Sequence, residues 1–409
     1  MLKSNLNIKK LPFKNYKKEY FLTYLSIAML NPTIAYYNFF HVIFTVIVVY
    51  EFYRIRLKID KLFLGTLLFL NFISIAQAIT FGTFTTTSYL GVFLTFLMPY
   101  FIARIMGNRY WHFYINIVYY LAIISLIFWS LQNISDSFTN LLFNISSSFK
   151  LDPISNESVI IYNLEFWRPS LTLGLLKNAG FTAEGGLYSC VLILALFFNS
   201  IYSKKLLNKK NLIFIISLLS TNSTAGYAAL GIYLIGTSLL FSQKSYKIIL
   251  LPISVVLFYL AIVQLPFMFD KVSKYYQQEM EIYHTTVNPS RVGRFLSARV
   301  DLDIIVRYPI WGQGIHKETR YRTLLEEQTG YSNSYLGIVG LASRYGLITW
   351  ILYFYYLFIY LIKFISMNNI NKIYSIFFLL SILAVATGQN PFFYPPYFIL
   401  AYLGYYLRK

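Results

Sequence analysis

The chain has little charge, and it has almost no cysteine or histidine. Of its 409 residues only 12% are charged, whereas a soluble domain carries about 25%. So few charges could not cover a water-soluble globule of this length, which argues against a cytosolic enzyme and a disordered chain. The single cysteine, Cys190, excludes a disulfide within the chain. The four histidines lie far apart without metal-ligand spacing, so we expect no metal and no cofactor.

What the sequence does have is long apolar runs. It is 57% hydrophobic and 20% aromatic, and about 20 apolar residues make one membrane-spanning helix. The runs predict an all-α polytopic membrane protein with about twelve transmembrane helices. The first run, which contains Asn31-Pro32, and the seventh are short, and each could be a broken or tilted helix. The runs lie near 20–34, 36–53, 62–80, 87–106, 113–131, 184–203, 211–222, 224–242, 247–267, 345–363, 373–388 and 392–407.

The basic residues predict which ends of these helices face the cytoplasm. With the N-terminus inside, the seven inside segments hold 22 of the 35 lysines and arginines but only three acids. The rest of the chain holds 13 basic and 13 acidic residues, so the whole excess of +19 lies on one side. This asymmetry follows the positive-inside rule and predicts that both termini are cytoplasmic. The positive charge therefore indicates topology, and we expect no nucleic-acid partner.

Two long segments are predicted on the outer side of the membrane. The first covers about 132–183, and the second, 268–344, lies between the ninth and tenth helices. The second alternates polar and apolar residues over a length that could hold helices, so we expect an ordered, partly helical extracytoplasmic subdomain. The chain is thereby divided into helices 1–9 within residues 1–267, the loop subdomain 268–344, and helices 10–12 within 345–409.

Charged residues are nearly absent from the predicted helix centres. Transporters and pumps place ionisable groups at membrane depth, whereas here Glu184 and Arg344 lie at outer helix ends. This distribution favours work at the outer membrane surface over translocation. Sugar transporters can use aromatic and amide groups instead of charges, so a flippase or another glycan transporter stays an alternative.

An arginine-rich run lies in the second outer loop, where residues 291–307 have the sequence RVGRFLSARVDLDIIVR. If this run is helical, Asp303 is four residues from both Arg299 and Arg307, which is the spacing of helix-surface ion pairs. Arg291 and Arg294 have no acidic residue three or four positions away and lie about one turn apart. Two such guanidinium groups suit a diphosphate. Lipid headgroups or a loop acid are the alternative partners.

Two further residues could take part in sugar chemistry. Glu184 opens the sixth predicted helix, and its carboxylate could accept a hydrogen bond or a proton from a sugar hydroxyl. The helix dipole alone also favours an acid in the first turn. His316 follows the sequence PIWGQGI in the second outer loop. It could contact the acceptor, although a lone histidine in a loop is commonly incidental.

Four short motifs occur along the second half of the chain. Residues 177–186, KNAGFTAEGG, are similar to the pattern R/K-N-x-G-x-x-x-E-P-G at the entry to a membrane helix, with Gly185 in place of the usual proline. Residues 220–227, STNSTAGY, are similar to T-x-S-T-x-G-Y, a break between two short helices.

The third motif leads from Arg294 or Arg299 to PIWGQG at 309–314 and resembles R-x(n)-P-x-x-G-x-G. The fourth joins NSYL at 333–336 to RYGL at 344–347 and resembles H-N-x-x-L followed by G-L. In this order and at these positions between the predicted helices, the four motifs resemble those of the O-antigen ligase and polymerase superfamily of bacterial envelope proteins.

The resemblance implies a metal-independent glycosyltransferase of the bacterial inner membrane, with its active site facing the periplasm. Its partners would be an undecaprenyl-diphosphate-linked glycan donor and acceptor, the membrane lipids, and a protein that regulates chain length. Loop arginines would hold the diphosphate while an acceptor hydroxyl attacks the anomeric carbon of the donor. The diphosphate is a good leaving group whose developing charge guanidinium groups can neutralise, so neither a metal nor a nucleotide sugar is needed.

Ligases of this superfamily have a histidine before the asparagine of the fourth motif, where this chain has Ser332. The departure favours a polymerase, which joins lipid-linked repeat units to a growing lipid-linked chain. A ligase, which moves finished glycan onto a lipid A core or a protein, stays an alternative. The site residues expected from the motifs and the chemistry are Arg291, Arg294 and Glu184 as catalytic groups, and Arg299, His316, Asn178 and Arg344 as substrate-binding groups.

Overall fold

The computed structural model describes residues 16–32, 34, 38–82, 86–148, 158–159, 162–163, 176–241, 294–314 and 337–408. Within these ranges the protein is helical apart from one short hairpin of two strands. The elements are α1 Lys17–Ala28, α3 Asn38–Arg54, α4 Lys61–Phe81, α5 Thr86–Met106, η1 Gly107–Arg109, α6 Tyr110–Ile134, α7 Asp136–Ser148, β1 Ser158–Val159, β2 Tyr162–Asn163, α8 Gly185–Ser203, α9 Lys209–Ser220, α10 Thr224–Phe241, α12 Arg294–Arg307, α15 Gly337–Met367, α16 Ile373–Ala386, η2 Pro391–Phe393 and α17 Pro395–Arg408.

Apart from α7 and α12, the helices fall on the apolar runs that predicted them, and the run 247–267 lies outside the described residues. Four described stretches are long and apolar enough to cross a membrane, whereas α10 and α16 are apolar but shorter. The four stretches are Lys61–Phe81, Tyr89–Ile134, Gly185–Ser203 and Gly337–Met367. The number of about twelve spans and the sidedness of the helices stay predictions.

Helix α8 is the central helix of the bundle. It packs against α6, α9, α10 and α16, and every side chain from Tyr188 to Phe198 is buried. On one side Phe198 stacks on Trp111 of α6 with ring centroids 3.8 Å apart, and on the other Phe197 stacks on Phe378 of α16 at 4.1 Å. Aromatic packing of this kind confirms that part of the aromatic content lies between helices.

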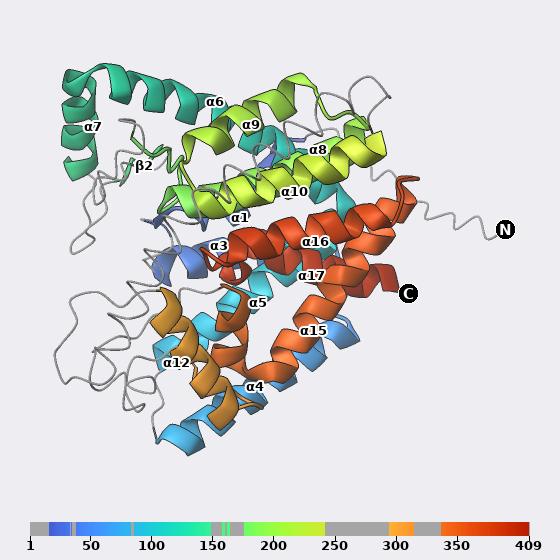
Figure 1. Ribbon diagram of the computed structural model, residues 1–409. Coiled ribbons are helices and arrows are strands. Elements are labelled where there is room, and N and C mark those ends of the chain that lie inside the picture. The colour runs from blue at the N-terminus through green and yellow to red at the C-terminus, as the bar shows by residue number, and fades with distance from the viewer. Residues whose placement is uncertain are drawn as a thin grey trace.

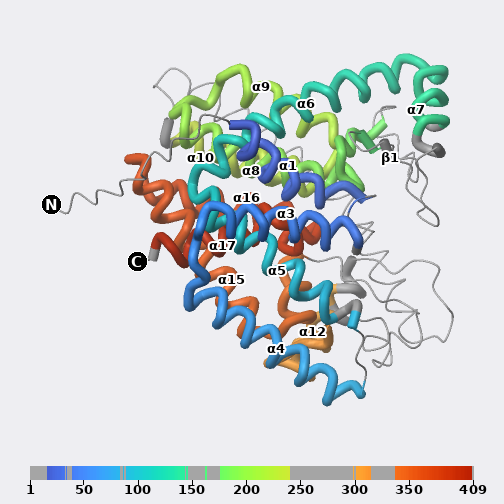
Figure 2. Tube along the Cα trace, turned by 180° about the vertical axis from the view of Figure 1, so that it is seen from behind, coloured from blue at the N-terminus to red at the C-terminus, as the bar shows by residue number. Residues whose placement is uncertain are grey.

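The remaining helices form a second group beside this core. Helix α15 packs along α17 and against α16, and α5 packs against α3 and α17. Helix α4 lies at one edge of the molecule in both views (Figures 1 and 2). Its apolar side chains, such as Leu68 and Ile79, are exposed, as expected for a helix that faces lipid.

The first outer segment is more structured than a loop. Residues 136–148 form α7, and the hairpin pairs Val159 with Tyr162. The Tyr162 hydroxyl donates to Gln132 Oε1 at 2.9 Å, so the segment folds back onto the end of α6. A search for long apolar runs misses α7 because half of this 13-residue helix is polar.

Two helices begin elsewhere than the sequence predicted. The tenth predicted run starts at 345, but α15 starts at Gly337 and is interrupted at Gly346, whose φ is +84°. The last run was predicted from 392, but α17 starts only at Pro395, because Pro395 favours the first turn of a helix over its interior. In the second outer loop, α12 confirms the expected helical content over residues 294–307.

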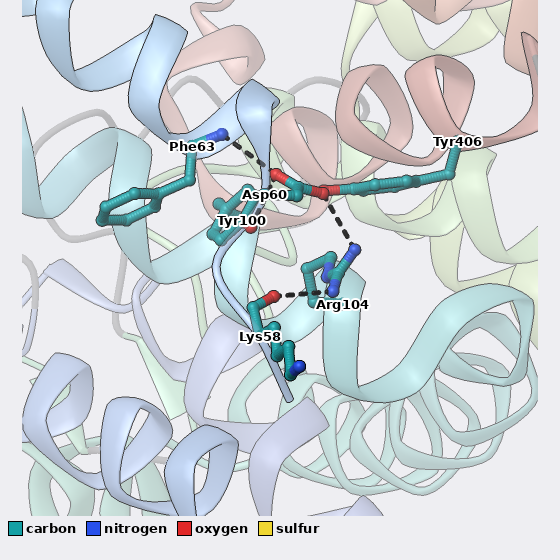
Figure 3. A network of polar contacts seen from close by, with 6 residues as sticks. All are labelled: Lys58, Asp60, Phe63, Tyr100, Arg104 and Tyr406. Atoms are coloured by element: carbon teal, nitrogen blue, oxygen red, sulfur yellow. Dashed lines mark hydrogen bonds and ion pairs between the residues drawn. The ribbon is translucent and has the colours of Figure 1, made fainter. Parts of the chain in front are cut away.

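The carboxylate of Asp60 ties three segments together at the predicted cytoplasmic end (Figure 3). It caps α4 by accepting from the Phe63 amide at 3.1 Å, and it accepts from the hydroxyls of Tyr100 (3.0 Å) and Tyr406 (2.7 Å). Arg104 on α5 pairs with the same carboxylate at 2.8 Å. The start of α4 is therefore joined to α5 and to the C-terminal helix α17.

We expect Asp60→Asn to destabilise the protein in a pH-dependent manner. Burial alone would raise the pKa of Asp60, but the hydrogen bonds from Tyr406, Phe63 and Tyr100 and the charge of Arg104 outweigh it and lower the pKa. A lowered pKa in the folded state means that the carboxylate stabilises the fold above about pH 4 and ceases to do so as the pH falls through the folded value. The expected loss is about 1–2 kcal/mol at neutral pH, measured by thermal unfolding in detergent.

Glu51→Gln is the matched control, because Glu51 is also partly buried but pairs with Arg54 one turn away within the same helix α3. A single ion pair at this spacing on one helix is worth about 0.2–0.5 kcal/mol. Equal destabilisation by the two variants, or a difference between wild type and Asp60→Asn that persists in acid, would contradict the role given to the Asp60 network.

Candidate functional site

At the predicted outer end of the bundle, helix ends are joined by backbone hydrogen bonds between segments far apart in the sequence. Three of these bonds use a carbonyl that the end of a helix leaves without an intrahelical partner, and the fourth uses the free amide of Gly337, the first residue of α15. The bonds run from Asn178 N to Ser220 O (2.9 Å), Gln313 N to Ser343 O (2.8 Å), Gly314 N to Arg344 O (3.0 Å) and Gly337 N to Gln389 O (2.9 Å). They bring residues of all four sequence motifs to one end of the protein.

The loop before α8 is held by the buried side chain of Asn178. Its amide group donates to the hydroxyls of Ser220 (2.9 Å) and Ser125 (3.3 Å), while its oxygen accepts from the Gly180 amide at 2.9 Å. Gly180 has a φ of +55°, and a Cβ there would lie 2.7 Å from the ring of Tyr188. Asn178 was expected to bind substrate, but its amide is occupied by the protein itself.

Glu184 is the N-cap residue of α8. Its backbone is extended, its side chain makes no capping hydrogen bond, and within the described ranges no hydrogen bond or ion pair engages its carboxylate. The next residue, Gly185, lies so close to the α9–α10 break that a Cβ would come within 2.6 Å of Thr221 O. The backbone at the start of α8 is therefore fixed by close packing, and the partly exposed carboxylate stands at the positive end of the helix dipole.

The predicted break between two short helices is confirmed at residues 221–223. Helix α9 ends at Ser220 and α10 begins at Thr224. The Tyr227 hydroxyl donates back across the break to Asn222 Oδ1 at 2.9 Å. A Cβ at Gly226 would lie 2.8 Å from Ser189 Cβ, so this glycine permits the close approach of α10 to α8.

The glycine-rich turn of the third motif docks against the interruption in α15. Gly312 has a φ of +65°, and a Cβ there would lie 2.6 Å from the backbone carbon of Arg344. At Gly346 a Cβ would fall onto Ile310 O, 1.9 Å away. The Leu347 amide, just after the interruption, donates to Pro309 O at 2.7 Å. Glycine is required at both positions by conformation and by contact.

Gln77 of α4 joins the turn to the interrupted helix from the side. Its side-chain nitrogen donates to Trp311 O at 2.6 Å and to Arg344 O at 2.9 Å. One amide group thus bonds to a carbonyl of the third motif and to one of the fourth. A polar amide in an otherwise apolar run was the available signal in the sequence.

Glu184 and Arg344 both lie beside the segment 389–394, which includes Tyr394. A Cβ at Gly186, in the first turn of the helix that Glu184 caps, would lie 2.4 Å from Gln389 Nε2. The Arg344 guanidinium lies over the ring of Phe393, with Cζ 4.3 Å from the centroid. Stacking on an aromatic ring orients a guanidinium group and restricts its rotation. The segment 389–394 therefore links the start of α8 to an oriented arginine.

The loop between α16 and α17 packs against the start of α8. A Cβ at Gly186 would lie 2.4 Å from Gln389 Nε2, so the loop packs on the first turn of α8. Two buried polar atoms, Asn390 Oδ1 and Trp311 Nε1, have no hydrogen-bond partner in the described part of the chain. Buried polar atoms usually have partners, so these two atoms mark places where a polar ligand or water would be accommodated.

Several predicted site residues cannot be placed. Arg291 and His316 lie outside the described residues. Arg294 and Arg299 lie on α12, whose backbone is described, but their side chains are not. Of the seven residues predicted for the site, Glu184 and Arg344 lie beside the segment 389–394. Asn178 holds the loop that leads to Glu184.

The ion pair expected between Asp303 and Arg307 on α12 does not form, although the helix that would support it does. Arg307 is exposed, and an exposed pair at this spacing gains only about 0.3–0.5 kcal/mol, which the loss of side-chain freedom can offset. The spacing permitted the pair without requiring it.

Tyr394, Gln389 and Phe393 were not predicted to belong to the site. Their signal was the cluster of prolines in QNPFFYPPY at 389–397, which marks a break inside the last predicted run. Among the described residues, no group of three histidine, cysteine, aspartate or glutamate side chains could hold a metal ion.

A comparison with family models matches residues 211–353 to the family described as Wzy_C, O-Antigen ligase. The matched segment is similar to the domain shared by O-antigen ligases and polymerases, which transfer glycans between lipid-linked substrates. It includes the α9–α10 break, the turn at 312–314 and Arg344, but not Glu184 or Tyr394. The family acts in the biosynthesis of lipopolysaccharide and other polysaccharides, and its members are multi-pass membrane proteins. No curated protein and no solved structure matches the chain.

We expect Gln77→Leu to loosen the turn at 312–314 without unfolding the bundle. The change removes two hydrogen bonds, each worth about 1 kcal/mol. Peptides that contain Gly314 or Leu347 should exchange their amide hydrogens about tenfold faster, as measured by hydrogen–deuterium exchange and mass spectrometry. Asn71→Leu, which removes a hydrogen bond between α4 and Tyr89, should leave these peptides unchanged. Equal exchange in both variants would show that Gln77 does not hold the turn.

Proposed function

We propose that this protein, which carries the domain shared by O-antigen ligases and polymerases, is a repeat-unit polymerase. It would transfer a growing glycan from undecaprenyl diphosphate to the acceptor sugar of a new lipid-linked repeat. The reaction would take place at the periplasmic face of the bacterial inner membrane. The product is O-antigen or a related surface polysaccharide.

The observation that supports the proposal is that the segment 389–394 lies beside both the start of α8, which Glu184 caps, and the guanidinium of Arg344. A transfer of this kind needs a group that accepts a proton from the acceptor hydroxyl and a cation that stabilises the leaving diphosphate. Glu184 has its carboxylate without a protein partner in the described ranges, and Arg344 supplies an oriented positive charge. The two residues belong to segments far apart in the sequence, so neither sequence motif alone indicates the site.

The chemical step can be assigned to these residues. The acceptor hydroxyl oxygen forms a bond to the anomeric carbon of the donor, and the bond from that carbon to the diphosphate oxygen breaks. Glu184 takes the hydroxyl proton, while Arg344, Arg294 and Arg299 neutralise the charge that develops on the departing diphosphate. Undecaprenyl diphosphate leaves, and the extended glycan remains on the diphosphate of the acceptor.

The other predicted residues take supporting parts in the proposal. Arg291 and Arg294 would bind the diphosphate, with Arg299 beside them, and His316 would contact the acceptor. Asn178 and Gln77 act as positioning residues, because their amides hold the loops that carry Glu184 and Arg344.

A ligase is the second candidate, and the description of the matched family favours it. The two activities differ in the acceptor and not in the bond that forms. Loss of a polymerase leaves single repeats attached to the lipid A core, whereas loss of a ligase leaves polymer that is intact but unattached. Ser332, at the position where ligases have a histidine, supports the polymerase.

Glu184→Gln and Arg344→Ala should each abolish the ladder of glycan lengths in a complemented deletion strain. Replacing a general base costs about 10²–10⁴-fold in rate, and Arg344→Lys should rescue only in part, because lysine lacks the planar fork of donors. Asp136→Asn and Arg307→Ala are matched controls, since both side chains are exposed in outer segments. A full ladder in Glu184→Gln would refute the role of the carboxylate.

Arg291→Ala and Arg294→Ala should collapse the ladder to a single repeat, because each removes a guanidinium group from the proposed diphosphate site. The measurement is the same electrophoretic ladder, with membrane expression checked by immunoblot. Purified protein with synthetic lipid-linked repeats then distinguishes the classes, since a flippase forms no longer product. Full ladders in both variants would remove these two arginines from the site.

A further inference from the structure

Helix α7 turns across the end of α6 at the predicted outer side of the bundle (Figures 1 and 2). Only Ser135 separates the two helices, and its hydroxyl oxygen accepts from the Phe138 amide at 3.2 Å. The Thr139 hydroxyl donates back to Gln132 O at 3.2 Å. The corner between the helices is therefore fixed by local hydrogen bonds.

One edge of α7 is packed against the protein. Leu142 forms a small apolar cluster with Tyr162 of the hairpin, and Phe138, Phe128 and Trp129 pack around it. The rings of Phe128 and Phe138 lie edge to face at 5.9 Å. This cluster holds α7 in one orientation about its own axis.

The neighbouring edge of α7 is apolar and exposed. Leu141 is 52% exposed and Ile145 38% exposed. On α6 the same kind of stripe precedes the corner, through Ile127 and Leu131 to Ile134, which is 82% exposed. Within each helix these residues are three or four positions apart and lie on one face. The helical repeat ends at Ser135, whose backbone is extended, so the stripe has one part on each side of the corner.

We infer that α7 lies in the lipid–water interface of the outer leaflet, with Leu141 and Ile145 in contact with the acyl chains. The occupant is lipid because α7 directly follows the exposed apolar face of α6, which is part of the stretch Tyr89–Ile134 that is long and apolar enough to span a membrane. The opposite face, with Asp136 and Asn140 exposed, suits water. Helices of this kind lie about 5–10 Å into the headgroup and acyl boundary.

The composition of the stripe distinguishes lipid from a protein partner. Its exposed positions are aliphatic, whereas protein interfaces concentrate aromatic side chains and arginine at their centres. Helix α7 also has no lysine or arginine, so its contact with the membrane depends on apolar burial and not on anionic headgroups.

The anchored corner is connected to the candidate site. Trp129 Nε1 donates to Leu176 O at 2.6 Å, and Asn133 Oδ1 accepts from the Leu176 amide at 2.8 Å. Leu176 lies two residues before Asn178, which holds the loop of Glu184. The depth of α7 in the leaflet thereby fixes one end of that loop relative to the membrane surface.

Spin labelling tests the inference on the full-length protein. Single cysteines are introduced at Leu141, Ile145, Asp136 and Asn140, while the natural Cys190 is buried and should not react. The labelled protein is reconstituted into vesicles of phosphatidylethanolamine and phosphatidylglycerol. Accessibility to oxygen, which concentrates in lipid, is compared with accessibility to a water-soluble nickel chelate. The ratio at positions 141 and 145 should exceed that at 136 and 140 several-fold.

A label at Ile127, on the exposed face of α6, gives the reference for full lipid contact. Similar ratios at all four α7 positions, whether all low as in water or all as high as at Ile127, would show that α7 does not lie at the interface and would overturn the inference. Low accessibility to both reagents at 141 and 145 would show that protein covers the stripe, which would overturn it equally. Leu141→Ser, which removes the apolar contact at an exposed position, should lower the ratio at a label on position 145. An unchanged ratio there would contradict the dependence on apolar burial.

Discussion

The structure depends on one constraint: helices that break inside a membrane protein must pair their free backbone groups within the protein, because the bilayer offers no partner. Here α9 and the first part of α15 end at breaks. The carbonyls at these ends accept from amides of facing loops, as Ser220 O does from Asn178 N and Arg344 O from Gly314 N. The free amide at the start of α15, Gly337 N, donates to Gln389 O in the loop between α16 and α17. The pairing fixes which loops lie together.

This pairing also explains the position of the charged residues. Glu184 follows the loop that Asn178 holds against the end of α9, and Arg344 belongs to the last turn before the interruption in α15. Each charge is carried by a segment whose backbone is already fixed. The start of α8, with Glu184, and the guanidinium of Arg344 therefore both lie beside the segment 389–394. Groups held in this way need little reorganisation when a substrate binds.

Helix α4 shows how polar contacts replace burial in a membrane protein. Few of its side chains are buried, so burial against the protein contributes little to its position. It is held instead at its two ends, by the Asp60 network with Arg104 at one (Figure 3) and by the two carbonyl bonds of Gln77 at the other. Polar side chains are effective in this role because lipid is as apolar as the helix surface.

The sequence by itself determined the helical architecture, because apolar runs, basic clusters and helix breakers act through local chemistry. It also indicated the break at 221–223, and it selected Glu184 and Arg344 from their position at helix ends. It did not indicate α7, because this helix has too many polar residues to form an apolar run. It also did not indicate that α15 starts at Gly337. Only the tertiary structure decided that Gln77, Tyr394 and Gln389 join the site, and that Asn178 is occupied by the protein. These roles arise from contacts between segments far apart in the chain, and no local pattern encodes which distant carbonyl or charge a side chain will meet.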